Sequence, residues 1–433
     1  MSADAKTSEH DITPEQLCIG LHVHLDLSWT EHPFTFSSFK IKSLDQIAII
    51  QGLGLKRIRY SPSKSDAKPL PAPAHTPPNK HPEPQPNAQQ AVINAADPAV
   101  KAKHERMHRL AEQRARTNAC EQGLLSAANT IKSINKDVFS KPDEVRDAAN
   151  TLITTIADSM LVDADVSVQL MADKVGGEDA YFHSLNVSLL SMMLAKELKA
   201  PAAMVQMVGV GALFHDIGEL EIPEQILRKQ EALNKAELTL LQMHCEYGIN
   251  IAKKMGLPTE VLQVISQHHE RVDGSGYPLG LTAAQMALPS RIVSLVNAYD
   301  ELCNPPNPAT ALTPHEALST LFAQQRARFD PLCMSTFVRC MGVYPPGTVV
   351  ILSNGATAME VSVNTSKPLR PVVVVYDPTV PKDAAIVVDL DTEQDISITQ
   401  TIRPQNLAPD AHAYLSPRKR MTYYFDTQPG QPG

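Results

Sequence analysis

Apolar and polar positions alternate near both ends of the chain, and between them apolar residues recur with the period of a helix. Near the N-terminus Val23, Leu25 and Leu27 alternate with polar residues and several aromatic residues follow, which predicts short strands with one helix. Toward the other end, four apolar runs separated by turn signals predict strands, and these runs are residues 348–352, 359–363, 371–376 and 385–390. We therefore expect a small α/β unit at 11–60, a β-rich extension at 344–392, and a tail of unassigned structure at 393–433.

The central part of the chain has a helical pattern. Apolar residues three and four positions apart, such as Leu125, Ala128 and Ile131, predict connecting helices over residues 99–174, and further helical segments follow over residues 175–343. The protein is therefore expected to be mainly α. Long amphipathic helices between two domains either pack on their own domain or pair with a second copy, so the pattern leaves a homodimer through the connecting helices open.

Prolines are concentrated between residues 61 and 98, and the whole chain has 34 prolines against 19 glycines. In this segment they lie among Ala, Lys, Asn, Gln and His. Such a composition cannot bury enough apolar surface to fold, and it favours extended polyproline conformations. The segment is therefore predicted to be a solvated, semi-rigid linker.

Length, charge and cysteine usage narrow the class of protein. A chain of 433 residues is long enough for more than one domain, and a formal charge of −8 with a pI of about 6.0 argues against nucleic-acid binding through a basic surface. No apolar run approaches the roughly 18 residues that span a bilayer, and the first residues lack a hydrophobic signal core, so a cytoplasmic protein is expected. The six cysteines include no Cys-x-x-Cys pair, which predicts reduced thiols rather than a zinc knuckle or a disulfide framework.

Five histidines and one aspartate occupy apolar helical settings in the central part, and they are His183, His215, Asp216, His244, His268 and His269. Residues three or four positions from each histidine are apolar, so the imidazoles are expected to point toward a core. A single histidine in such a place is more often a core residue bonded to a backbone carbonyl, but five with an adjacent carboxylate favour a metal site. Neutral imidazole with carboxylate, and without cysteine, suits Fe, Mn, Zn, Ni or Co in a site that is not a structural zinc site.

The adjacent pair His215 and Asp216 adds a geometric point. A carboxylate beside an imidazole can bridge two metal ions while the histidine binds one of them. Two metal ions a few ångströms apart can hold a hydroxide and clamp both the attacking and the leaving oxygen of a phosphodiester. The cluster therefore predicts hydrolysis of a phosphate ester without a protein nucleophile.

A long motif begins at His268 and His269, the last two histidines of this set. It reads His-His-Glu-Arg-Val-Asp-Gly-Ser-Gly-Tyr-Pro over residues 268–278, and its two glycines predict a tight turn. Together with His-Asp-Ile-Gly at 215–218 and Ile-Pro at 222–223, this motif resembles the HD-GYP family of bacterial signalling phosphodiesterases. The resemblance covers about residues 179–380, and residues 13–60 are similar to a small domain of unknown function that often precedes the family's domain.

The resemblance implies an HD-type helical bundle at 175–343 that opens cyclic di-GMP to linear pGpG and then GMP, using two or three Fe or Mn ions. Carried over by position, the implied metal ligands are His183, His215, Asp216, His244, His268, His269 and Asn297, with Asp179 for a third ion. The implied catalytic positions are His215, Asp216 and Glu219. The implied substrate or partner loop consists of Glu270, Asp273, Gly274, Gly276, Tyr277 and Pro278. This loop either docks partners such as diguanylate cyclases (GGDEF proteins) or only caps the metal-bearing helix.

Three positions depart from the family pattern. Glu219 stands where a lysine usually neutralises the scissile phosphate, and Asn297 stands where an aspartate usually binds metal. Residues 304–309 contain no basic residue, although an Arg-Pro-Tyr-Arg stretch is usual there. Losing one charge-assisted phosphate contact costs on the order of 1.5–3 kcal/mol, so several such losses could lower activity by orders of magnitude.

These departures keep other hypotheses open. The main alternative is a weak or inactive domain that acts as a sensor by binding cyclic di-GMP or a partner, and a third hypothesis is an HD phosphohydrolase for another nucleotide. Activity would survive if the metal ions alone supplied the positive charge. It would also survive if a nearby basic residue reached the phosphates, and the candidates are Arg228, Lys229, Arg271 and Arg291.

Overall fold

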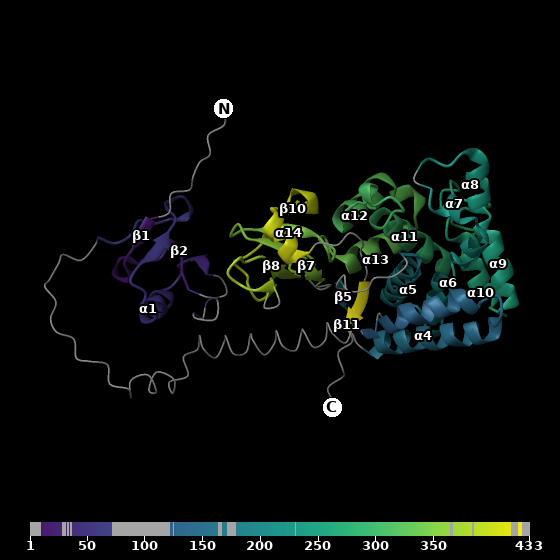
Figure 1. Cartoon of the computed structure of the whole chain (residues 1–433), viewed down its shortest axis with the longest axis horizontal. Helices are drawn as coiled ribbons and strands as arrows, with labels where there is room; N and C mark the ends of the chain where they lie inside the picture. Colours follow the sequence, from purple (N-terminus) through teal and green to yellow (C-terminus); the bar gives the residue numbers. More distant parts are fainter. Residues whose placement is uncertain are drawn as a thin grey trace. The chain divides into compact units, whose positions relative to one another are not determined.

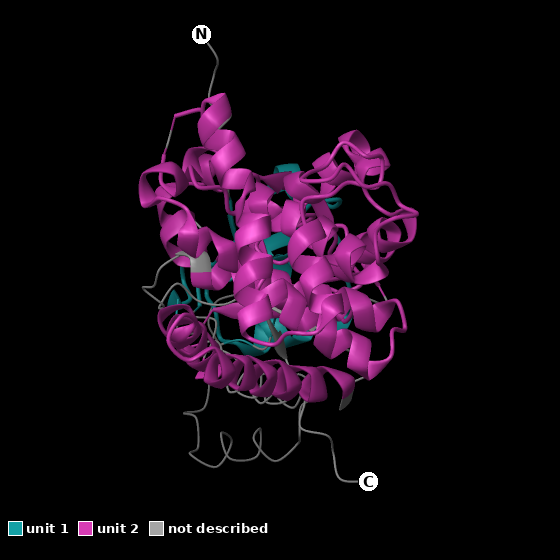
Figure 2. Ribbon diagram, turned by 90° about the vertical axis from the view of Figure 1, so that its right-hand side faces the viewer, with its two compact units in different colours: residues 1–112, 377–384 teal, residues 113–376, 385–433 magenta. Residues whose placement is uncertain are grey.

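The computed structural model describes residues 10–27, 32, 34, 37–71, 122–123, 125–162, 167–170, 179–229, 231–363, 367–382, 385–416 and 423–426. The chain divides into two compact units, one made of residues 1–112 with 377–384 and the other of 113–376 with 385–433 (Figure 2). Most of the predicted linker, residues 72–98, lies outside the described residues. In the described part of the chain, no helix is long and apolar enough to cross a membrane.

The first unit contains a four-stranded antiparallel sheet and one helix. The strands follow the order β1 (His10–Ile12), β4 (Ile58–Tyr60), β2 (His22–His24) and β3 (Ser38–Lys40), and the helix is α1 (Leu44–Gly52). Alternating apolar side chains, including Leu21, Val23 and Leu25, are almost fully buried in its core. Ser43 begins α1, because its side chain accepts a hydrogen bond from the backbone N–H of Gln46. The predicted small α/β unit is confirmed.

This unit extends further along the chain than its predicted end at residue 60. The backbone N–H of Asp66 donates to the carbonyl of Gly20 at 2.8 Å, and that of Leu70 donates to Gln16 at 2.9 Å. Lys40 forms an ion pair with Asp66 at 2.9 Å. Residues 61–71 are therefore folded against the sheet, although their prolines predicted a linker. Composition could not show this, because the hydrogen bonds join residues about fifty positions apart.

The second unit is built mainly from helices, which confirms the predicted fold class. Its N-terminal part is a helix over residues 125–137 and then α4 (Pro142–Val162). The helices around the site are α5 (Asp179–Glu197), α6 (Ala202–Leu213), α9 (His244–Lys254), α10 (Thr259–Gln267) and α11 (Leu288–Cys303) (Figure 1). Outer elements are η4 (Ile217–Glu221), α7 (Glu224–Leu227), α8 (Lys235–Gln242), α12 (Pro314–Gln324) and α13 (Pro331–Met341). Because α6 is apolar on all sides, it is buried, and it packs against α4, α5 and α10.

A seven-stranded antiparallel sheet completes the second unit. Its main path is β10 (Ile398–Ile402), β6 (Val349–Leu352), β7 (Thr357–Ser362), β5 (Ser167–Leu170) and β11 (Tyr423–Asp426). Strand β8 (Val372–Val375) pairs with β7 and with β9 (Ile386–Asp389). Strands β6 to β9 confirm the predicted β-rich extension.

One sequence prediction about this sheet is wrong, and one region that the sequence left unassigned is folded. Residues 167–170 form strand β5 instead of continuing the helices predicted up to residue 174. The tail, in which the sequence showed no clear architecture, contains β10, helix α14 (Pro409–Leu415) and β11. The reason is the same in both cases, since β5 pairs with β11 and β7, which are distant in sequence.

Candidate metal centre

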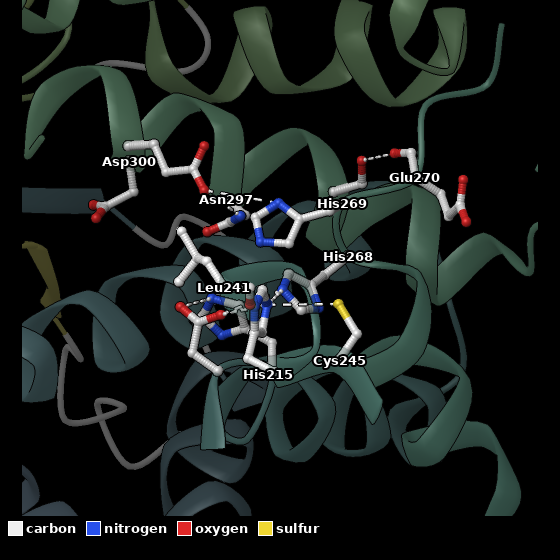
Figure 3. Close-up of polar contacts among 12 residues, drawn as sticks. His215, Leu241, Cys245, His268, His269, Glu270, Asn297 and Asp300 are labelled. Atoms are coloured by element: carbon white, nitrogen blue, oxygen red, sulfur yellow. Dashed lines mark hydrogen bonds and ion pairs between the residues drawn. The ribbon is translucent and has the colours of Figure 1, made fainter. Parts of the chain in front are cut away.

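The five histidines and Asp216 come together from four segments of the helical bundle. His183 lies in the first turns of α5, and His215 and Asp216 follow directly after α6. His244 begins α9, while His268 and His269 follow the last residue of α10. Figure 3 shows the rings of His215, His268 and His269 gathered between these helices. His215 and His268 are fully buried, so the cluster is part of the bundle interior.

Asp216 lies between two groups of imidazole nitrogens. Its Oδ2 is 3.0 Å from Nε2 of His215 and 3.4 Å from Nε2 of His183. Its Oδ1 is 3.3 Å from Nε2 of His268 and 3.6 Å from Nε2 of His244. Each carboxylate oxygen therefore faces a different pair of histidines, which is the arrangement expected of a carboxylate that bridges two metal ions.

Hydrogen bonds at Nδ1 determine which ring nitrogen of these histidines can bind a metal ion. Nδ1 of His215, His244 and His268 lies 2.7, 2.6 and 2.8 Å, respectively, from the carbonyl oxygen three residues earlier. Nδ1 of His183 lies 2.7 Å from Oδ2 of Asp300, which is itself fully buried. Because a carbonyl only accepts, Nδ1 carries the hydrogen, and the lone pair of the neutral ring is on Nε2. Hydrogen bonds of this kind orient histidines that bind metals.

The donor set fits divalent cations. Nε2 of His183 and Nε2 of His215 are 3.1 Å apart, and so are Nε2 of His244 and Nε2 of His268. Two lone pairs at this distance repel each other unless a proton or a cation lies beside them. The ligand atoms form two groups, each within 4.8 Å: His183 with His215 and Asp216, and Asp216 with His244, His268 and His269. The two groups share only Asp216.

The protonation states of His268 and Asp216 suit metal binding, whereas His183 must lose a proton to a bound cation. Burial lowers the pKa of His183, but its hydrogen bonds with Asp216 and Asp300 outweigh this and hold the pKa well above the usual value. Burial lowers the pKa of His268 to about 4, so this ring is neutral near pH 7. Burial opposes ionisation of Asp216, but the surrounding imidazoles, His215 first and then His183 and His268, hold the pKa of Asp216 well below its usual range. Neutral imidazole and ionised carboxylate are the forms that coordinate metals.

Cys245 is adjacent to the cluster but is a poor ligand. Its sulfur lies 3.5 Å from Nε2 of His244, and the side chain is buried (Figure 3). Burial raises the pKa of the Cys245 thiol to about 12, so the thiol remains protonated, whereas metals bind the thiolate. This agrees with the sequence analysis, which left cysteine out of the ligand set.

The structure places Asn297 beside a residue that the sequence reasoning missed. Asn297 is fully buried on α11, and its Nδ2 donates to Oε1 of Glu301 at 2.9 Å. Glu301 lies one helical turn later, so its position on the same face could have been found from helical periodicity. The other position that the motif implied, Asp179, is the first residue of α5, and its side chain lies outside the described residues.

Acidic side chains adjoin the centre, and the basic residues proposed from the sequence have acceptors of their own. Burial and then the charge of Asp216 raise the pKa of Glu219, which follows Asp216 in η4, to about 8. Each of the four basic candidates has an acceptor: Arg228 with Glu224, Lys229 with Glu237, Arg271 with Ser294, and Arg291 with Asp330. Metal ions are therefore the simplest source of positive charge for an anionic substrate.

The buried carboxylate of Glu270 anchors the loop at residues 268–281 through hydrogen bonds to its backbone. The carboxylate is fully buried, and it accepts hydrogen bonds from the backbone N–H groups of Leu279 at 2.6 Å and Leu281 at 2.8 Å. Gly276 is needed because a Cβ atom there would lie 2.5 Å from Cα of Glu270. The sequence analysis assigned Glu270 to a substrate or partner loop, but its carboxylate points into the protein.

The outer part of this loop contacts the candidate centre through Tyr277. Tyr277 stacks on the ring of His269 with centroids 4.5 Å apart, and the Tyr277–Pro278 peptide bond is cis. Asp273 accepts hydrogen bonds from the backbone and the hydroxyl of Ser275, which closes the turn that contains Gly274. Leu279 remains 72% exposed. The loop therefore caps α10 and, through Tyr277, packs on His269.

Replacing Glu270 by glutamine should loosen the loop. The amide can accept only one of the two backbone hydrogen bonds, which leaves a buried donor unpaired at a cost of about 1–3 kcal/mol. Hydrogen exchange at Leu279 and Leu281 should accelerate, and chemical unfolding should begin at lower denaturant. The matched control is Glu260→Gln, because Glu260 is exposed on α10. Unchanged exchange at both amides would contradict this role.

Comparison with known protein families identifies both parts of the chain. Residues 165–332 match the HD domain, and residues 10–149 match a domain of unknown function, DUF3391. The resemblance drawn from the motifs is therefore confirmed for both regions.

Several relatives of known name are similar to part of this chain. A cyclic di-GMP phosphodiesterase of Pseudomonas aeruginosa is 31% identical over 229 residues, which are 53% of this chain and 55% of that protein. A cyclic di-GMP phosphodiesterase response regulator of Xanthomonas campestris is 31% identical over 38% of this chain and 43% of that protein. A 3′3′-cGAMP-specific phosphodiesterase of Vibrio cholerae is 37% identical over 31% of each chain. The chain thus spans about half, or less, of the length of these relatives.

Among solved structures, an HDG"Y"P protein from Bdellovibrio bacteriovorus matches with a TM-score of 0.39 at 15% identity. The match covers 76% of this chain and 98% of that one.

Proposed function

We propose that this chain, which joins a DUF3391 domain to an HD domain, is a metal-dependent phosphodiesterase that hydrolyses cyclic di-GMP to pGpG, to GMP or to both. The observation that carries the proposal is the position of Asp216, whose two oxygens face separate histidine pairs. Two divalent ions, with Fe or Mn the best fit to the ligand set, would supply the Lewis acidity and the activated water that phosphodiester hydrolysis needs.

Each residue of the centre has a defined role in this proposal. His183 and His215 would hold one ion, His244, His268 and His269 would hold the other, and the Asp216 carboxylate would be available to both. The buried carboxylate of Asp300 orients His183, because it accepts the hydrogen of Nδ1 at 2.7 Å. A third ion near Asp179 is a further part of the proposal. Tyr277 excludes water from one face of the His269 ring.

The distribution of charge supports complete dependence on metal. Asp216 is ionised, and burial raises the pKa values of Glu219 and Glu301. Arg228, Lys229 and Arg291 pair with Glu224, Glu237 and Asp330, respectively. Without bound cations, such a site would not attract a dianionic cyclic dinucleotide. We therefore expect no measurable turnover after the metal is removed with a chelator.

The biological setting belongs to the same proposal. We propose a bacterial signalling enzyme of the cytoplasm that dimerises through the connecting helices, of which residues 125–137 and α4 are described. The loop at 268–281 would contact diguanylate cyclases, because it places the exposed Leu279 beside the Tyr277 ring that stacks on His269.

The test combines metal analysis with turnover in one sample. Protein purified without oxygen is analysed for metal, and cyclic di-GMP and 3′3′-cGAMP are then offered with added Mn(II) or Fe(II). Two or more ions per chain together with linear product from cyclic di-GMP would support the proposal. Binding of cyclic di-GMP without cleavage would refute it in favour of a sensor, and cleavage of cGAMP alone would refute the substrate.

Replacing Glu219 by lysine should increase turnover of cyclic di-GMP. The change puts a cation where a carboxyl group now lies near Asp216, and one charge-assisted phosphate contact is worth on the order of 1.5–3 kcal/mol, or about ten- to a hundredfold in rate. Glu221→Lys is the matched control, because Glu221 is exposed and the change in net charge is the same. Equal kcat/KM values for the two variants would show that position 219 does not reach the phosphates.

A further inference from the structure

A carboxylate lies one helical turn beyond Asn297, at a position that the family motif does not mark. Asn297 and Glu301 are four residues apart on α11 and therefore share a face of the helix. Oε1 of Glu301 accepts the hydrogen bond from Nδ2 of Asn297 at 2.9 Å and lies 3.9 Å from Nδ1 of His269. Figure 3 shows Asn297 and His269 close together above the other rings. Glu301 thus connects two residues of the candidate centre.

The hydrogen bond determines the orientation of the Asn297 amide. A carboxylate can only accept, so the NH₂ end of the amide must face Glu301 and the carbonyl oxygen must face away from it. Asn297 is fully buried, and its Oδ1 has no hydrogen-bond partner among the described residues. An unpartnered buried carbonyl is costly, and a cation would satisfy it. The free oxygen is the atom that a metal ion would use.

Glu301 also supplies charge that the centre otherwise lacks. The family pattern has an aspartate where this chain has the neutral Asn297, but the Glu301 carboxylate lies within hydrogen-bond distance of that amide. Within the described ranges, no lysine or arginine forms an ion pair with Glu301; burial raises the pKa of this carboxyl, and the nearby charge of Arg271 partly offsets that rise. Its side chain is 45% exposed, which places it at the outer rim of the cluster.

His269 gives a second reason for a carboxylate at this place. The other four imidazoles of the cluster each have an acceptor within 2.8 Å of Nδ1. For His269, the Glu301 carboxylate is 3.9 Å from Nδ1. At 3.9 Å this is not a hydrogen bond, so the Glu301 carboxylate acts on the His269 ring through its charge.

We propose that Glu301 is a positioning residue of the metal centre: it holds the Asn297 amide with its carbonyl oxygen toward the ions, and it supplies beside His269 the negative charge that Asn297 lacks. In this chain the carboxylate is on Glu301, the hydrogen-bond partner of Asn297, instead of on residue 297 itself. This inference rests on the metal binding in the proposed function, but it does not depend on the identity of the substrate.

The test measures binding of Mn(II) to metal-free full-length protein, using the electron paramagnetic resonance signal of the free ion. Glu301→Ala removes both the charge and the acceptor, whereas Glu301→Gln removes only the charge. Asn297→Asp/Glu301→Ala restores a charged ligand that needs no orienting partner. Glu260→Gln, an exposed change on α10, is the control. Thermal unfolding of each metal-free variant checks that it is folded.

Glu301→Ala is expected to weaken the more weakly bound Mn(II) by about ten- to a hundredfold, with a smaller loss for Glu301→Gln. The double variant should return to within about threefold of the unmodified protein, and this recovery also shows that alanine at 301 does not prevent folding. Affinity of Glu301→Ala equal to that of the control, or a double variant as weak as Glu301→Ala, would overturn the role.

Turnover of cyclic di-GMP in the same samples separates this inference from the proposed function. If the unmodified protein binds two Mn(II) ions but cleaves nothing, the function fails while the role of Glu301 is still decided by affinity. If the unmodified protein binds no metal, both are overturned.

Discussion

Replacing Asp216 by alanine is expected to remove bound metal and to lower turnover of cyclic di-GMP by about three orders of magnitude or more, which corresponds to roughly 4 kcal/mol of transition-state stabilisation. The reason is that each carboxylate oxygen of Asp216 faces its own pair of imidazoles. Oδ2 faces His183 and His215, and Oδ1 faces His244 and His268. Without this carboxylate the two histidine pairs have no shared ligand, and their positive ions would repel each other without compensation.

Metal content and metal-dependent stabilisation measure this loss independently of activity. The unmodified protein should unfold at a higher temperature when Mn(II) is added, because the ion binds the folded state, and the Asp216→Ala protein should show a much smaller shift. Asp158→Ala is the control, since Asp158 is exposed on α4. Two metal ions per chain in Asp216→Ala, or retained hydrolysis, would refute the proposed centre.

Replacing Gly218 by alanine should disturb the centre through packing alone. A Cβ atom at this position would lie 1.9 Å from the carbonyl oxygen of His244 and 2.5 Å from the backbone nitrogen of Gly248. Both contacts are with backbone, so η4 and α9 must separate, and overpacking of this kind costs about 1–3 kcal/mol or more. Because η4 follows Asp216 and α9 begins with His244, the separation would pull ligands of the two groups apart.

The expected result for Gly218→Ala is a melting temperature lower by several degrees together with reduced metal content. The control is Gly52→Ala at the end of α1, where nothing lies within 4 Å of an added Cβ. A Gly218→Ala protein with normal metal content and an unchanged melting temperature would contradict this prediction, because it would show that the backbone moves to accommodate the added Cβ atom without disturbing the centre.

The sequence was informative about the metal centre because its residues carry local signals. His183, Asp216 and His244 each lie beside apolar residues with helical spacing, so their burial could be predicted before any fold was known. The motif over residues 268–278 was equally local, because a tight turn with two glycines and a proline depends on neighbouring residues. The alternating runs that became β6 to β9 were recognised for the same reason.

The sequence could not determine the direction of side chains in and around the loop. Glu270 was expected to face substrate or a partner, but only the folded loop brings the N–H groups of Leu279 and Leu281 to its carboxylate. Likewise, Lys229 was a candidate for binding phosphate until the structure paired it with Glu237 at 2.6 Å. The partner of a charged group depends on packing between segments, which a linear pattern does not contain.

The sequence by itself therefore determined the helical character of the protein, the small N-terminal α/β unit, and the identity of the residues in the candidate centre. Tertiary structure alone decided that β5 and β11 join one sheet, that residues 61–71 belong to the first unit, and that Glu301 lies beside His269. The physical reason is the range of the interactions. Helical and turn preferences act over a few residues, whereas strand pairing and the surroundings of a carboxylate arise from segments that meet only when the chain folds.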